Sequence, residues 1–136
     1  MAEFPRLVQT VIDTTDVRRT AEFYRELFGL VYRPGDEAPP QDGELEQWLV
    51  LRHPEGGNAI AFQYTDELAP TTWPDPEVPM QLHLDFSVED VDELRRHRAR
   101  AEALGATLRL DRFDDPDEPL FVMTDPQGHP FCLFVG

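Results

Sequence analysis

His83 and Asp85 are the two residues whose types and spacing most directly suggest chemistry. They lie two positions apart in an alternating segment at residues 81–88, so their side chains point to the same face of an extended strand. A carboxylate beside an imidazole can make the imidazole a general base. The same pair can also contact a bound ligand, or only orient the strand through a hydrogen bond, and the sequence leaves these three alternatives open.

Cys132 is the single cysteine of the chain, and it could act as a nucleophile only as a thiolate held beside a cation. Its surroundings are acidic, so we expect a buried thiol that packs as a small apolar side chain. The other three histidines have simpler interpretations. We expect His53 and His129 in solvated turns, and His97 on a solvated helix face where acidic residues precede basic ones.

The composition excludes several classes of function. The 136 residues include 27 acidic side chains against 12 lysines and arginines, all of them arginine, for a net charge of −15. This acidity argues against nucleic acid and anionic membrane surfaces as partners. No apolar run approaches the roughly 18 residues of a membrane span, and no basic segment followed by an apolar one opens the chain, so we expect a cytoplasmic protein. The sequence contains no glycine-rich phosphate loop, paired-cysteine motif or serine nucleophile motif.

Two strand-then-helix segments must position these residues. A β-branched run at residues 7–13 leads into a helix between Asp16 and Gly29, and residues 81–88 lead into a second helix between Asp90 and Gly105. Each aspartate is a typical N-cap, and each glycine is a typical helix stop. Three candidate strands follow each helix, at residues 30–33, 47–53 and 58–64 in the first half and at residues 106–113, 120–124 and 129–135 in the second.

The two halves therefore repeat one βαβββ pattern. We expect an α+β fold of two tandem modules, residues 1–64 and 80–136, joined by a proline-rich linker at residues 65–79. A module of about 60 residues is marginal for independent stability, so the two should share a core or an interface.

The pieces resemble the vicinal oxygen chelate superfamily, which includes glyoxalases, bleomycin-resistance proteins and extradiol dioxygenases. The resemblance covers nearly the whole chain and implies eight strands forming a curved sheet, or cup, around a ligand site, with the helices outside. The matching motifs are Asp16 with Phe23-Tyr24 and Leu27-Phe28-Gly29, His83-Leu-Asp with Val88-Glu-Asp90, Ala103-Leu-Gly-Ala106, and Asp125-Pro-Gln-Gly128-His-Pro-Phe131.

The family's metal site takes one residue from the first strand and one from the last strand of each module. Carried over by position, these residues are Gln9, Ala61, His83 and Cys132. Gln9 and His83 are acceptable ligand types, whereas Ala61 cannot ligate and Cys132 would replace a hard oxygen by a soft thiolate. The resemblance therefore implies that the hard-ion site is not intact. We expect no cofactor, with a divalent metal as the alternative.

Strand alternation assigns side chains to the inside of the cup. Ala61 would add an apolar contact there. Trp73 in the linker could supply an aromatic wall or could only pack the linker, and Trp48 could line the cup or fill the core. The predicted ligand contacts are Gln9, Val11, Asp13, Trp48, Gln63, His83, Asp85, Cys132 and Phe134.

Three functions are compatible with this sequence. The leading hypothesis is a glyoxalase-like protein that binds a small molecule in the cup without an intact metal site, similar to drug-binding resistance proteins whose acidic clefts take cationic ligands. A metal-dependent lyase, isomerase or dioxygenase is the first alternative, and a non-catalytic interaction domain is the second. We expect a small-molecule partner, favour a cationic one because acidic loops could rim the cup, and note that a homodimer is compatible with the family.

Overall fold

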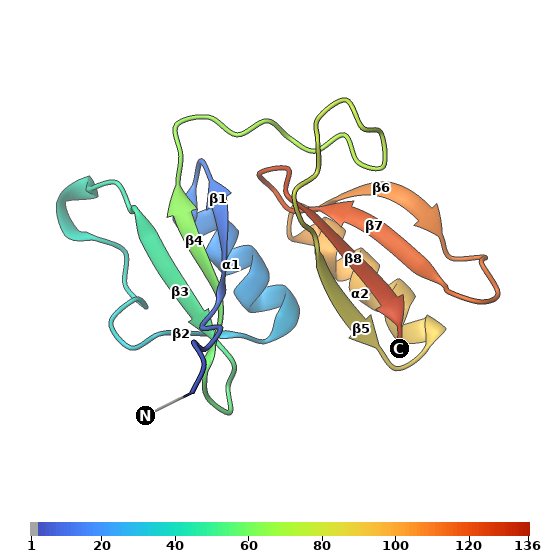
Figure 1. Ribbon diagram of the computed structural model, residues 1–136, viewed down its shortest axis with the longest axis horizontal. Helices are drawn as coiled ribbons and strands as arrows, with labels where there is room; N and C mark the ends of the chain where they lie inside the picture. The colour runs from blue at the N-terminus through green and yellow to red at the C-terminus, as the bar shows by residue number, and fades with distance from the viewer. Residues whose placement is uncertain (1–2) are drawn as a thin grey trace. The chain divides into compact units, whose positions relative to one another are not determined.

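The computed structural model describes residues 3–136, which divide into two compact units, one ending at Glu67 and one beginning at Leu68 (Figure 1). Each unit has the predicted βαβββ order and a sheet of four strands. The predicted α+β fold of two modules is therefore confirmed, with the eight strands divided equally between two sheets. A cup that involves both modules stays a prediction.

The first unit contains β1 (Thr10–Thr14), α1 (Val17–Phe28), β2 (Val31–Tyr32), the short 3-10 helix η1 (Gln41–Gly43), β3 (Trp48–Arg52) and β4 (Asn58–Tyr64). The strand order is β1-β4-β3-β2, with β1 parallel to β4. Helix α1 packs on β3 and β4, and its buried Tyr24 lies 5.6 Å from the buried Phe62 ring of β4. The strand start predicted at residue 7 is wrong, because Leu7 is exposed and pairing begins at Thr10.

The second unit contains β5 (Leu84–Val88), α2 (Val91–Ala103), β6 (Thr107–Arg112), β7 (Leu120–Thr124) and β8 (Pro130–Val135). The strand order is β5-β8-β7-β6, with β5 parallel to β8, so it repeats the order of the first unit. Helix α2 buries only Leu94 and Ala101. Much of its arginine-rich surface pairs with acidic residues of the same helix, which fits the predicted solvated face.

The predicted helix boundaries are confirmed by their caps. The carboxylates of Asp16 and Asp90 each accept the backbone N–H three residues later, which satisfies a donor that the first helical turn leaves free. Gly29 follows α1 with φ of 68° and Gly105 follows α2 with φ of 108°, a backbone conformation that favours glycine. Neither helix in the described part of the chain is long and apolar enough to cross a membrane.

The second unit differs from prediction at the start of β5. The strand begins at Leu84 rather than at residue 81, and Leu82 is exposed rather than part of the apolar face under α2. The ladder with β8 begins at Leu84 opposite Phe131, and the ladder of the first unit begins at the matching position, Thr10 opposite Ile60. His83 consequently lies just before the strand.

Candidate functional site

The candidate site lies where β5 and β8 run side by side in the second unit (Figure 1). Their parallel register places Asp85 directly opposite Cys132. Helix α2 covers the other face of this sheet. Its Arg98 lies over the ring of Phe121, and Phe121 is paired with Leu133. Leu133 follows Cys132 on β8, so the two side chains point to opposite faces. The polar side chains of β5 therefore lie on the face opposite the helix, as alternation predicts.

Three polar groups meet on this face. His83 Nε2 lies 3.2 Å from Asp85 Oδ1, and the Cys132 sulfur joins them so that one ligand atom from each residue lies within 4.8 Å of the other two. The exposed fractions of the side chains are 29% for His83 and 57% for Asp85, whereas Cys132 is buried. The cluster is thus open to solvent through its carboxylate and closed at its thiol.

The Cys132 thiol is protonated at neutral pH. Burial is the main cause that raises the pKa of Cys132 from 9.0 to about 12, and the charge of Asp85 and a hydrogen bond to Asp85 raise it further, followed by the charge of Glu118. The thiol therefore donates to the carboxylate instead of acting as an anion. A protonated thiol is a poor nucleophile, which agrees with the expectation of a buried, unreactive cysteine.

The imidazole of His83 is also held from one side. The indole of Trp73 stacks on it, with ring centroids 4.7 Å apart and planes inclined by 18°. The sequence suggested Trp73 either as an aromatic wall or as linker packing. Its partner could not be predicted, because the contact depends on how residues 68–79 dock on the second unit.

In the first unit the polar residues of the predicted site form two hydrogen-bonded pairs. Gln63 Nε2 donates to Asp13 Oδ1 at 2.9 Å, and Asn58 Nδ2 donates to Gln9 Oε1 at 2.8 Å. Sequence reasoning did not include Asn58. Its place at the start of β4, directly after a pair of turn glycines, is the only signal that could have suggested it.

The remaining predicted contacts are apolar and belong to both units. Val11 lies opposite Ala61 in the β1–β4 register, and Ala61 is fully buried. Trp48, opposite Gln63, is 37% exposed, so filling of the core is not its role. Phe134 lies two residues after Cys132 on β8 and is partly exposed. Contact of these residues with a ligand stays a prediction.

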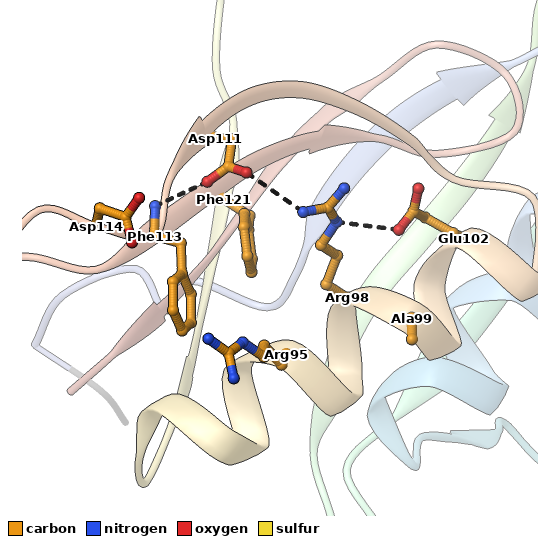
Figure 2. Close-up of a pocket in the computed structure, with 8 residues that line it drawn as sticks. All are labelled: Arg95, Arg98, Ala99, Glu102, Asp111, Phe113, Asp114 and Phe121. Carbon is orange, nitrogen blue, oxygen red and sulfur yellow. Dashed lines mark hydrogen bonds and ion pairs between the residues drawn. The ribbon is translucent and has the colours of Figure 1, made fainter.

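Figure 2 shows a cavity of the second unit that lies outside the predicted site. Its volume is about 370 Å³. Arg95 lies 4.4 Å from the centroid of the Phe113 ring, and Arg98 lies 4.9 Å from that of Phe121. Arg98 also pairs with two carboxylates. The arginine run of α2 thus covers aromatic rings in addition to facing solvent. The cavity is lined by Arg95, Arg98, Ala99, Glu102, Asp111, Phe113, Asp114 and Phe121.

Comparison with known families supports the resemblance seen in the sequence. A family described as a glyoxalase-like domain matches residues 9–134. No functionally curated sequence matches the chain significantly.

Several solved structures share the fold over nearly the whole chain. A glyoxalase/bleomycin resistance protein/dioxygenase family enzyme from Burkholderia phytofirmans PsJN is 18% identical with a TM-score of 0.67, over 94% of this chain and 96% of its own. The fosfomycin resistance protein FosX from Mesorhizobium loti is 18% identical with a TM-score of 0.67, over 100% and 94%. FosX from Listeria monocytogenes, complexed with Mn(II) and a sulfate ion, is 18% identical with a TM-score of 0.65, over 98% and 93%. At these identities the likeness establishes the fold.

The donor set of this chain does not fit a hard ion of the Mn(II) type. Such an ion prefers oxygen and nitrogen ligands. Of the four positions that the resemblance assigns, Ala61 carries a buried methyl group, Cys132 offers a soft sulfur, and the Gln9 oxygen already accepts a hydrogen bond from Asn58. His83 is a suitable donor type, and its Nε2 already lies 3.2 Å from Asp85 Oδ1.

Proposed function

Because the chain belongs to the glyoxalase-like family, we propose that it binds a small molecule beside His83, Asp85 and Cys132 without a hard-ion site. The donor set carries this proposal, since Ala61 and Cys132 stand where the resemblance implies carboxylates. The polar groups of the second unit contact one another instead. The Asp85 carboxylate of this cluster is exposed, so a ligand could reach it directly.

The charge of this face favours a cationic ligand. The Asp85 carboxylate is more than half exposed, and the negative charge of Glu118 also acts on the buried thiol. An ammonium or amidinium group could form a charge-assisted hydrogen bond with Asp85 while the rest of the ligand contacts His83. Structural relatives that include a bleomycin resistance family member and fosfomycin resistance proteins support a drug-binding or resistance role as part of this proposal.

Calorimetric titration with cationic glycopeptide-like and aminoglycoside-like compounds tests the proposal. We expect binding that weakens as salt is added, and a loss of about fivefold in affinity in Asp85→Asn, the size of a partly exposed ion pair. Asp92→Asn, which removes an exposed carboxylate from α2, is the matched control and should bind like the wild type. Absence of binding across the whole panel would contradict the proposal.

One observation favours a second candidate, a metal-dependent lyase, isomerase or dioxygenase. The ligand atoms of His83, Asp85 and Cys132 are close enough to converge on one ion. Metal analysis of the purified protein separates the candidates, because our proposal predicts less than one divalent ion per chain and ligand binding that a chelator leaves unchanged. Stoichiometric metal that is lost together with activity in His83→Ala would establish the second candidate instead.

A further inference from the structure

The proline-rich segment at residues 68–79 docks on the turn before β8. The Thr71 N–H donates to the Gly128 carbonyl at 3.0 Å, and Pro70 lies directly against the same glycine. A Cβ atom at position 128 would lie 2.7 Å from Pro70 Cβ and 2.9 Å from its Cα, and φ at Gly128 is 93°. Both the contact and the backbone conformation require glycine here.

Side-chain hydrogen bonds fix the segment beyond this anchor. The Trp73 N–H donates to Thr71 Oγ1 at 3.1 Å, the Val78 N–H donates to Thr72 Oγ1 at 2.9 Å, and Thr72 Oγ1 donates to the Asp75 carbonyl at 2.9 Å. Threonine hydroxyls that bond to nearby backbone groups stabilise turns where neither helix nor sheet supplies partners. The segment therefore has a defined conformation, and Trp73 has a defined place in it.

Trp73 is aimed at the proposed site. Its indole stacks on the His83 imidazole, while Asp85 holds Nε2 of the same ring at 3.2 Å. The imidazole is thus fixed on one face and at one nitrogen. The indole and the exposed carboxylate both contact this one imidazole. An aromatic ring and a negative charge near one another attract organic cations, because the ring quadrupole and the charge act together.

We propose that residues 68–79 are a wall of the ligand site, in which Trp73 positions His83 and makes the site selective for organic cations over their neutral analogues. This inference rests on the proposed function, because it names the ligand class and the selectivity residue of that same site. Asp75 and Glu77, which are exposed on the same segment, add negative charge to the wall.

Histidine ring NMR spectra test the placement without any ligand. The chain has four histidines, and His83→Gln assigns the signal of interest. We expect the His83 ring protons to be shifted upfield by the indole, to lose this shift in Trp73→Leu, and to keep part of it in Trp73→Phe. Unchanged signals of His53 and His97 show that the variants fold, and a His83 signal unaffected by Trp73→Leu would overturn the placement.

Binding of benzamidinium and of its neutral analogue benzamide tests the selectivity. We expect the wild type to prefer the cation, Trp73→Leu to lose about fivefold of that preference, and Trp73→Phe to recover most of it, because phenylalanine retains an aromatic face. An equal preference in the wild type and in Trp73→Leu would overturn the inference and leave the proposed function standing. A wild type that binds benzamidinium no better than benzamide would overturn the ligand class, and absence of any ligand in the wider panel would overturn the proposed function itself.

Gly128→Ala tests the anchor, with Gly57→Ala as the matched control. Both glycines have a positive φ, of 93° and 88°, but a Cβ atom at Gly57 would meet nothing within 4 Å. We expect Gly128→Ala to remove the His83 ring shift although Trp73 is still present, and Gly57→Ala to leave it unchanged. A shift that persists in a folded Gly128→Ala variant would show that the wall does not depend on this contact.

Discussion

Alkylation of Cys132 tests the electrostatics of the candidate site, and the single cysteine makes the signal unambiguous. With a pKa of about 12, roughly 1 in 10,000 Cys132 side chains is ionised at pH 8, whereas about one tenth would be with the unshifted pKa of 9.0. The thiolate is the nucleophile, so this ratio alone predicts a slowing of about 1,000-fold. The greater intrinsic nucleophilicity of a high-pKa thiolate offsets part of the effect, while burial works against reaction. We expect a slowing of at least about 100-fold.

The assay compares iodoacetamide labelling of the native chain with labelling of the same chain in urea, followed by mass spectrometry. Asp85→Asn should accelerate native labelling, because it removes a negative charge that raises the pKa of Cys132 and leaves only a neutral amide oxygen to accept from the thiol. Asp92→Asn serves again as the control. A native rate within tenfold of the unfolded rate, or no acceleration in Asp85→Asn, would refute a protonated thiol held by burial and by Asp85.

Two further predictions concern stability. Folding raises the pKa of Cys132 from 9.0 to about 12, so the protonated thiol contributes to the free energy of unfolding fully below pH 9, and this contribution is lost as the pH rises towards 12. The urea midpoint should therefore fall across this window more in the wild type than in Cys132→Ala. Arg18→Ala should lower the free energy of unfolding by about 2–3 kcal/mol in urea titrations, because Arg18 donates to Glu46 at 2.9 and 2.8 Å and to three loop carbonyls. Arg18→Lys should recover only part of the lost stability, because lysine cannot make all of these hydrogen bonds. Equal stability of Arg18→Ala and the wild type would contradict the assigned contacts.

The repeated module could be predicted because its signals are local. The aspartate before each helix and the glycine after it act on backbone groups only a few residues away. Both helices begin and end where those residues indicate. The strand Leu120–Thr124 also has its predicted bounds. By contrast, the start of β5 depends on where its ladder with another strand, β8, begins, so the alternating pattern around Leu82 continues beyond the end of the hydrogen-bonded ladder.

The candidate site could be predicted only in part, for the same reason. Alternation places His83 and Asp85 together, since they are neighbours in sequence. The contact of Asp85 with Cys132 depends on the register of two strands far apart in the chain, and the stacking of Trp73 on His83 depends on how a segment without regular secondary structure docks at Gly128. Neither the register nor the docking has a local sequence signal.

The two modules share a backbone plan but not the same chemistry. The β1–β4 and β5–β8 pairs have the same parallel arrangement, yet the first places Val11 opposite Ala61 where the second places Asp85 opposite Cys132. An apolar pair offers a ligand no charged group, whereas the pair of Asp85 and Cys132 includes an exposed carboxylate next to His83. Because the backbone is common to both, the difference arises from the side chains alone. Substitution at these positions, without a change of fold, is therefore sufficient to place an exposed carboxylate in the second module where the first module has an apolar side chain.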